Sequence, residues 1–364
     1  MHKKSVIMLP TAVAMVVCSL LGCGDNGNGP ANESPAIASL EASANSVDPT
    51  ARVTVACAAS DGDGDPLTYA WGKDAGEVSG SGSSVTWTAP ETVGSYSIWV
   101  EVTDGKGGEA ADTAEVSVLD GVLLVQTDDG LMAVTLGGVK ALFYGTYGEV
   151  EVLGDRIFIG PSGTTLELDQ DGNLVGSITR PPQIPGAATF VVLPDAGFAF
   201  VNNSNDSIYF MDAAGAFVTA GLIPTPSPSG LQSTSGLAVG NRLIMADSQP
   251  DQVFAYDLST HEGSVLRDLL DQNLQPFDID RSEGTFYVSG SRKVCKFTET
   301  GDVETICTLP TGNLTSLAVV GSYTYLSSNA GGVMYKVDIY TGQYEVLVDG
   351  LNHPEDVEYL RLAP

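Results

Sequence analysis

Short stretches in which apolar and polar residues alternate fill most of the chain from about residue 36 onward. Residues 52–58 (RVTVACA) and 96–102 (YSIWVEV) alternate with a period of two, which is typical of strands with one buried face. Gly, Asn, Asp and Pro separate such stretches and favour tight turns. The pattern therefore predicts an all-β protein.

Residues 36–119 contain about seven such strands, as expected of an immunoglobulin-like β-sandwich. Cys57 and Trp71 have the spacing at which strands B and C of that fold place a core cysteine and tryptophan. Tyr96 precedes Ile98 by two residues, as the tyrosine of a tyrosine corner precedes the second cysteine. Because Ile98 replaces that cysteine, we expect Cys57 to be a buried free thiol.

Two phrases in this segment, residues 61–71 (DGDGDPLTYAW) and 102–108 (VTDGKGG), resemble the PKD-type and cadherin-like domains of bacterial surface proteins. The resemblance implies a surface-exposed sandwich.

Three aspartates, Asp61, Asp63 and Asp65, suggest a metal site in the same segment. Pro66 and Gly72 stand where an EF-hand loop needs glycine and glutamate, which excludes an EF-hand. A looser carboxylate site for calcium and a solvated turn between two strands both fit the remaining pattern.

Residues 120–364 repeat one unit six times. Its innermost strand recurs about every 40 residues, at residues 150–154, 190–194, 237–241, 277–280, 317–320 and 356–360. Glycines at the centres of hairpins give the same count independently: Gly138, Gly172, Gly215, Gly263, Gly301 and Gly342. Four-stranded units of about 40 residues are the blades of a β-propeller.

The two series are offset from each other. The first hairpin precedes any innermost strand, and the last innermost strand, residues 356–360, has no hairpin after it. We therefore expect the C-terminal strand to lie innermost in the first blade and to close a six-bladed ring, which removes free sheet edges.

Two cysteines, Cys295 and Cys307, lie symmetrically about Gly301. This symmetry predicts that they face each other across a hairpin of the fifth blade and form a disulfide. The alternative is a pair of buried thiols.

Residues 275–280 (QPFDID), 352–359 (NHPEDVEY) and 236–247 (GLAVGNRLIMAD) resemble NHL and SMP-30-type propellers. Lactonases of the SMP-30 type hold a metal at the channel mouth with Glu, Asn and Asp. The matching positions here are Phe277, Glu355, Thr189, Gly236 and Ser316, so the Asn and Asp ligands are missing.

Loops that enter the innermost strands, and loops between the second and third strands, share one face of a propeller. Carboxylates and amides on that face form a candidate ligand surface, able to hold a hard cation such as calcium or, alternatively, only solvated. They are Asp128, Glu149, Asn202, Asn203, Asp206, Asp247, Asp251, Asp278, Asn329, Glu355 and Asp356.

Charge and histidine content exclude some classes of partner and of metal site. The net charge of -29 argues against a nucleic-acid partner, because no basic stripe could neutralise phosphates. After the first segment the histidines are His261 and His353, too few for multi-histidine zinc or copper sites. His353, beside Glu355, is a candidate general base, and no serine lies in a Gly-x-Ser-x-Gly elbow.

Residues 1–22 have the form of an export signal, with a basic start and an uncharged, mostly apolar run. The sequence Leu-Leu-Gly-Cys at residues 20–23 resembles the lipobox of bacterial lipoproteins. The resemblance implies that Cys23 becomes the lipidated first residue, and the alternative is an ordinary signal peptide that contains a cysteine. Residues 23–35 form a polar tether.

These features predict a lipid-anchored protein of the bacterial cell envelope, located at the outer membrane or cell surface in a Gram-negative organism. Its propeller would bind a protein or polysaccharide without catalysis, and the lipid would provide the membrane contact. The alternative is a calcium-dependent hydrolase or lactonase with its site on the channel face.

Overall fold

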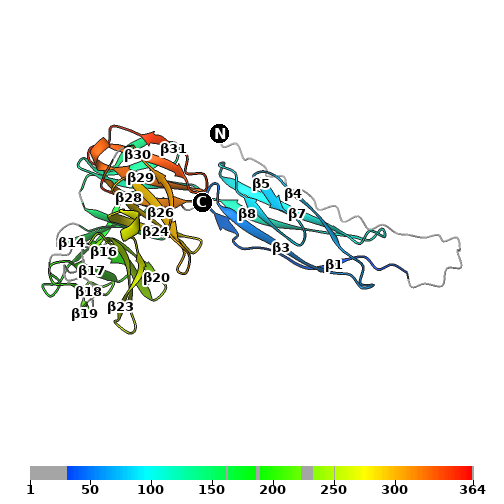
Figure 1. Ribbon diagram of the computed structural model, residues 1–364, viewed down its shortest axis with the longest axis horizontal. Coiled ribbons are helices and arrows are strands. Elements are labelled where there is room, and N and C mark those ends of the chain that lie inside the picture. Colours follow the sequence, from blue (N-terminus) through cyan, green and yellow to red (C-terminus); the bar gives the residue numbers. More distant parts are fainter. Residues whose placement is uncertain are drawn as a thin grey trace, which may run out of the picture.

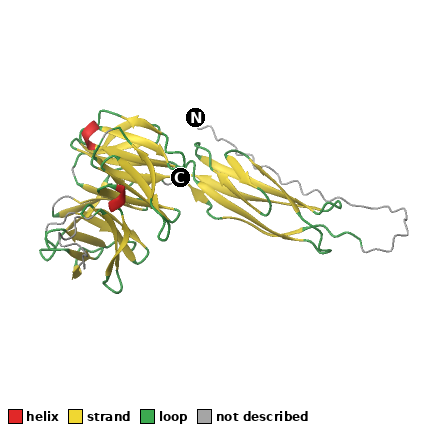
Figure 2. Ribbon diagram, in the orientation of Figure 1, coloured by secondary structure: helices red, strands yellow, loops and turns green. Residues whose placement is uncertain are grey.

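The computed structural model describes residues 31–146, 148–160, 163–185, 189–222, 233–249, 251–310 and 312–362. They form two β-domains placed end to end, an elongated sandwich and a propeller (Figure 1). Helix in these ranges is limited to the 3-10 turns η1 (Leu270–Gln272) and η2 (Asn329–Gly331) (Figure 2). The all-β prediction is confirmed.

The expected signal peptide, Cys23 and most of the tether lie outside the described residues. Among the residues described, no helix has the length and apolar character needed to cross a membrane.

The sandwich consists of two four-stranded sheets. One sheet has the order β1-β3-β6-β5 and the other β2-β8-β7-β4. The strands are β1 (Ala36–Ala42), β2 (Ser46–Val47), β3 (Arg52–Ser60), β4 (Thr68–Lys73), β5 (Glu77–Gly80), β6 (Ser84–Thr88), β7 (Gly94–Thr103) and β8 (Glu109–Val118). Alternate residues of β3 and β7 are buried, as the period of two predicts.

The immunoglobulin-like details are present with one difference. The Tyr96 hydroxyl donates to the Thr92 carbonyl at 2.8 Å, which makes a tyrosine corner. Cys57 is a buried free thiol, as predicted, and Trp71 packs beside it while half-buried. The fully buried tryptophan of the core is instead Trp87, whose indole N–H donates to the Ala75 carbonyl.

The propeller contains six four-stranded sheets, each ordered from the channel outward. Blade 1 has β32 (Asp356–Arg361), β9 (Gly121–Thr127), β10 (Gly130–Thr135) and β11 (Lys140–Tyr144); blade 2 has β12 (Glu149–Leu153), β13 (Arg156–Gly160), β14 (Thr164–Leu168) and β15 (Leu174–Thr179); blade 3 has β16 (Thr189–Val192), β17 (Phe198–Asn202), β18 (Ser207–Met211) and β19 (Phe217–Leu222). Blade 4 has β20 (Ser233–Val239), β21 (Arg242–Asp247), β22 (Gln252–Asp257) and β23 (Gly263–Asp268); blade 5 has β24 (Pro276–Ser282), β25 (Thr285–Gly290), β26 (Lys293–Phe297) and β27 (Glu304–Thr308); blade 6 has β28 (Leu314–Val320), β29 (Tyr323–Ser328), β30 (Val333–Asp338) and β31 (Tyr344–Val348).

Closure by the C-terminal strand is confirmed. β32 pairs antiparallel with β9 over six residue pairs, from Asp356 opposite Gln126 to Arg361 opposite Gly121. The last strand of the chain therefore completes the first blade, and apolar side chains of adjacent blades pack face to face around the ring.

The predicted Cys295–Cys307 disulfide is wrong: both cysteines are free thiols. A bulge shifts the register between Val294 and Cys295, so that Val294 lies opposite Cys307 and Cys295 lies opposite Thr305. Because side chains alternate across a strand, Cys295 packs toward blade 4 and Cys307 toward blade 6. The symmetry about Gly301 is therefore lost within the hairpin.

The loop between β2 and β3 forms hydrogen bonds with the propeller. Asp48 accepts hydrogen bonds from the Arg361 guanidinium at 2.7 and 2.5 Å and from the Tyr359 hydroxyl at 3.2 Å. Thr50, whose φ of 64° is unusual for a β-branched residue, makes two hydrogen bonds with Ser322. The sandwich thus contacts the end of the closing strand β32 and the turn between β28 and β29.

Candidate functional site

The register of the blades defines a mouth and a sandwich-bearing end. In every blade the start of the innermost strand lies beside the end of the second strand, as Glu149 lies opposite Gly160 and Asp356 opposite Gln126. This end of the propeller, which we call the mouth, is opposite the end that contacts the sandwich. The sequence-derived ligand surface falls at the mouth: Asp128, Glu149, Asn202, Asp247, Asp278, Asn329 and Glu355 all lie at strand starts, strand ends or adjoining loops there.

Two of these residues shape the loops of the mouth. Asp247 is fully buried at the end of β21, where its carboxylate accepts hydrogen bonds from the Gln252 amide at 2.9 Å and the Gln249 backbone at 3.1 Å. Asn202 ends β17 in the same way and accepts from the Ser204 backbone at 2.8 Å. Both side chains hold the turn that follows their strand.

Glu149 and Asp278 point into the seams between blades. The Glu149 carboxylate accepts a hydrogen bond from the Phe190 N–H of blade 3 at 2.9 Å, and Asp278 accepts one from the Leu317 N–H of blade 6 at 2.7 Å. Asp356 accepts one from the Val150 N–H of blade 2 at 2.7 Å. Since an innermost strand has no further strand beyond it, these carboxylates satisfy N–H groups that would otherwise be unpaired at the channel.

Ser316 connects two of these carboxylates. Its hydroxyl lies within hydrogen-bonding distance of both Asp278 and Asp356 and accepts a hydrogen bond from the Val357 N–H at 3.0 Å. Asp278, Ser316 and Asp356 therefore form a continuous set of polar side chains from blade 5 through blade 6 to blade 1. We call this set, together with Glu149, the first ring.

A second ring of carboxylates lies two residues further along the same strands and was missed by the sequence reasoning. It contains Glu151, Asp280 and Glu358, and Asp280 accepts a hydrogen bond from the Val319 N–H at 2.7 Å. The signal that could have found it is the alternation of side chains in a strand, which places residues i and i+2 on one face.

Burial gives these channel carboxylates unusual proton affinities. It raises the pKa of Asp280 to about 6 and, together with the charge of Asp278, the pKa of Asp356 to about 7. Burial, followed by the charges of neighbouring channel carboxylates, raises the pKa of Glu149, Glu151 and Glu358 well above the usual range. The surroundings of the channel carboxylates therefore favour their protonated forms.

The rim of blade 1 carries the histidine singled out in the sequence. His353 Nδ1 lies 2.7 Å from Asp128 Oδ2, so Asp128 is a partner of this histidine. Asn352 donates to Asp129 at 3.2 Å beside this pair. These exposed side chains extend the polar surface of the mouth.

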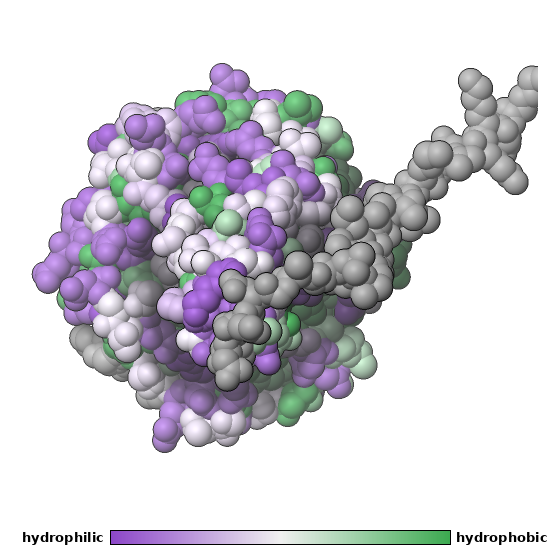
Figure 3. All heavy atoms as spheres, turned by 90° about the vertical axis from the view of Figure 1, so that its right-hand side faces the viewer, coloured by the Kyte–Doolittle hydropathy of each residue, from purple (hydrophilic) through white to green (hydrophobic). Residues whose placement is uncertain are grey.

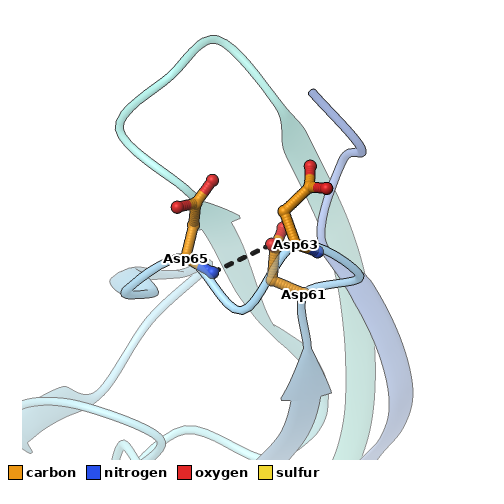
Figure 4. Close-up of side chains that lie close together, drawn as sticks. All are labelled: Asp61, Asp63 and Asp65. Carbon is orange, nitrogen blue, oxygen red and sulfur yellow. Dashed lines mark hydrogen bonds between the residues drawn. The ribbon is translucent and has the colours of Figure 1, made fainter. Parts of the chain in front are cut away.

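The three aspartates of the sandwich lie together (Figure 4). Their loop follows β3 at the end of the sandwich remote from the propeller. One carboxylate oxygen from each of Asp61, Asp63 and Asp65 lies within 4.8 Å of the other two. Among the described residues, these three form the group whose spacing suits a metal ion. Asp61 accepts hydrogen bonds from the backbone of Asp63 and Asp65, and the Lys106 ammonium lies 2.7 Å from Asp65 Oδ1. The second oxygens, Asp61 Oδ2 and Asp65 Oδ2, are buried and have no hydrogen-bond partner among the described residues.

The segment that precedes β1 lies against this cluster. The Glu33 N–H donates to Asp63 at 2.7 Å, and the Asn32 amide donates at 2.7 Å to Asp104, which is buried in the loop between β7 and β8. Oxygen ligands of this kind suit a hard cation such as calcium.

Comparison with known proteins agrees with the two-domain architecture. Residues 32–119 match the family described as Bacterial Ig domain. No curated protein matches the chain.

Solved structures resemble the chain at low sequence identity. The structure of a nidogen/laminin complex is 9% identical, covers 66% of this chain and 98% of its own, and has a TM-score of 0.53, which supports the propeller fold alone. A streptogramin B lyase is 13% identical, covers 65% of this chain and 87% of its own, and has a TM-score of 0.48. An auxiliary nutrient binding protein from Bacteroides thetaiotaomicron VPI-5482 is 15% identical, covers 89% of this chain and 92% of its own, and has a TM-score of 0.44.

Proposed function

We propose that this chain is a lipid-anchored bacterial envelope protein in which the sandwich acts as a spacer and the mouth of the propeller binds a protein or an extracellular polysaccharide without catalysis. The lipid on Cys23 provides the membrane contact, and residues 23–35 connect it to the sandwich.

The observation that carries this proposal is the order of the parts along the molecule (Figure 1). Glu33, near the end of the tether, lies against the Asp61–Asp65 loop at the far end of the sandwich. Strands β7 and β8 each have ten residues and thus separate the two ends of the sandwich by roughly 33 Å. The propeller follows, with its mouth directed away from the sandwich, so the mouth is the part most remote from the anchor.

The exposed surface suits a protein that works in an aqueous envelope compartment. Viewed from the sandwich end, hydrophilic residues predominate and hydrophobic ones are scattered among them (Figure 3). With a net charge of -29, the protein would be repelled by anionic lipid, so the lipid anchor and not the protein surface accounts for membrane contact in this proposal.

A test compares charge changes at the mouth with a matched change at the opposite end. Asp128→Lys and Asn329→Lys alter the mouth, whereas Asp155→Lys alters the exposed turn between β12 and β13. The probe is the extracellular polysaccharide fraction of the source organism, measured by co-sedimentation. We expect the mouth variants to weaken binding about tenfold and Asp155→Lys to leave it unchanged. Equal effects of the three changes would refute the proposal, and no binding by the parent protein would exclude the polysaccharide as the partner of the mouth.

The hydrolase alternative requires a calcium ion at the channel carboxylates. Glu149, Asp278 and Asp356 each accept a backbone hydrogen bond from the next blade, which explains their presence by a structural role. A calcium-induced rise in melting temperature that disappears in Glu149→Gln or Glu355→Gln would favour the hydrolase over the binding protein.

A second role, calcium binding by the sandwich, is favoured by the two buried oxygens of Asp61 and Asp65 that lack hydrogen-bond partners. A calcium ion there would link the segment before β1 to the sandwich and stiffen the anchor end. We expect calcium to raise the melting temperature of the parent protein, and Asp61→Asn or Asp63→Asn to abolish the rise while Asp155→Asn preserves it. A rise of equal size in all three variants would exclude this site.

A further inference from the structure

A cavity of about 440 Å³ lies where the sandwich meets blades 5 and 6, on the end of the propeller opposite the mouth. Arg52 of β3 forms its wall on the sandwich side. Its propeller walls include Tyr287 of β25, Lys296 of β26 and Tyr340 from the turn after β30. The volume is in the range of pockets that take small organic ligands.

Arg52 is held in place but keeps its hydrogen-bonding capacity. Its guanidinium carbon lies 3.8 Å from the centre of the Tyr340 ring, so the two planar groups form one platform. Within the described residues the guanidinium has no hydrogen-bond or ion-pair partner, although it is the cation that the sandwich contributes to the cavity. Its N–H donors are therefore available to a ligand.

Tyr287 supplies a hydrogen-bonding group at the wall of the cavity. The residue is buried except for 6% of its surface, and it lines the cavity. Its hydroxyl is not one of the fully enclosed polar atoms that lack a partner, so the hydroxyl opens onto the cavity. A ligand bound there could take the place of solvent as its partner.

The charges of the cavity select the class of ligand. Lys296 is paired with Glu304, with 3.5 Å between Nζ and Oε2. The remaining charged lining groups are Arg52 on one side and Glu283 and Asp302 on the other. An anion would meet the two carboxylates and a cation would meet Arg52, whereas the hydroxyls of a neutral polyol can accept from the donors and donate to the carboxylates.

We propose that this cavity binds a neutral sugar unit of an extracellular glycan, with Arg52 and Tyr287 donating hydrogen bonds to its oxygens and Glu283 and Asp302 accepting them. Because Arg52 belongs to the sandwich and the other three residues to the propeller, the bound sugar also links the two domains. The site is separate from the mouth and does not depend on the function proposed for it.

The test uses the full chain and three neutral disaccharides, cellobiose, lactose and maltose, titrated by calorimetry, with glucuronic acid as the anionic comparison. Tyr287→Phe removes the hydroxyl at the cavity wall and Arg52→Ala removes the sandwich donor. Tyr209→Phe is the matched control, since it removes a hydroxyl from blade 3 that accepts a hydrogen bond from Asn205. Tyr287→Phe should melt like the parent, because no hydrogen bond within the protein is lost.

We expect at least one disaccharide to bind more tightly than glucuronic acid, with affinity about tenfold lower in Tyr287→Phe and in Arg52→Ala and unchanged in Tyr209→Phe. The proposal is overturned if none of the disaccharides binds. It is equally overturned if binding survives Tyr287→Phe and Arg52→Ala undiminished, or if glucuronic acid binds best.

Discussion

At the scale of single residues, the carboxylates of the channel combine a structural role with an electrostatic cost. Glu149, Asp278 and Asp356 pair with the N–H groups at the inner edge of the next blade. They also repel one another, and burial disfavours their charged forms. A hydrogen bond from one blade to the next is retained when such a side chain takes up a proton, so protonation relieves repulsion without opening the seam.

The stability of the propeller should therefore fall as the pH rises. Asp356 has a pKa of about 7 in the folded protein against an ordinary value of 3.8. The stability associated with this raised pKa is fully present below about pH 4 and is lost as the pH rises to about 7. We expect Asp356→Asn to reduce the loss of unfolding free energy between pH 5 and 8 by on the order of 2 kcal/mol, measured by urea unfolding at each pH.

Asp155→Asn is the control for net charge, because it removes one negative charge from an exposed turn. It should leave the steep pH dependence of the parent in place. A parent protein as stable at pH 8 as at pH 5 would show that the channel carboxylates ionise without cost.

The candidate residues at this scale could be predicted only in part. The strand starts and loop positions of Asp128, Glu149 and Asp278 follow from the repeat, because the repeat fixes which end of each strand faces the mouth. What Asp247 contacts could not be predicted, since a carboxylate that caps a turn and one that faces solvent look alike in a single sequence. Nor could the partners of Tyr287 and Arg52, which come from segments far apart in the chain.

At the scale of elements, two independent periodicities were enough to predict the six blades and their closure by residues 356–360. The innermost strands recur because each blade needs a buried strand at the channel. Of the hairpin glycines, Gly138, Gly172, Gly215 and Gly342 take the positive φ that a tight turn favours, whereas Gly263 begins β23. The prediction of a disulfide failed because it assumed a regular hairpin. One bulge between Val294 and Cys295 moves Cys307 to the opposite face of the sheet, and nothing in the sequence marks its position.

The cysteines give a direct test of that register. Unfolding the protein without reductant and alkylating it should modify Cys57, Cys295 and Cys307 completely, as seen by peptide mass spectrometry. In the folded protein Cys295 should react slowly, because it is buried and burial raises its pKa. A peptide pair cross-linked through Cys295 and Cys307 would contradict the bulge.

Closure is tested by removing residues 354–364, which include all of β32. The edge of β9 would then be unpaired and blade 1 would lack its innermost strand, so we expect an insoluble product. Removal of residues 362–364 is the control and should leave solubility intact, because β32 ends at Arg361. A soluble product of the longer truncation that melts like the parent would contradict closure.

At the scale of the whole molecule, the sandwich and the closing strand are mechanically connected. Asp48 binds Arg361 and Tyr359, both in β32, and Thr50 binds Ser322 in the neighbouring blade. The sandwich thus holds the strand that closes the ring, and the same contacts fix the mouth on the side remote from the sandwich.

Asp48→Ala should weaken the hold of the sandwich on β32 and loosen the orientation of the sandwich relative to the propeller. Loss of the paired carboxylate leaves Arg361 without its partner and should lower the stability of the propeller by about 1–2 kcal/mol. Small-angle X-ray scattering should show a broader distribution of distances between the domains than in the parent. Lys106→Ala, which removes the ion pair with Asp65 at the far end of the sandwich, should leave the scattering unchanged. An unchanged profile for Asp48→Ala would mean that other contacts set the orientation.

The central claim is that a lipid on Cys23 anchors the chain and that the sandwich carries the mouth away from the membrane. The most direct measurement uses the lipidated protein in vesicles that contain an energy-acceptor lipid, with a fluorophore on Asp63→Cys near the tether or on Asp128→Cys at the mouth. The account predicts strong energy transfer from position 63 and weak transfer from position 128. Equal transfer from both positions, or a protein that does not remain on the vesicles, would contradict it.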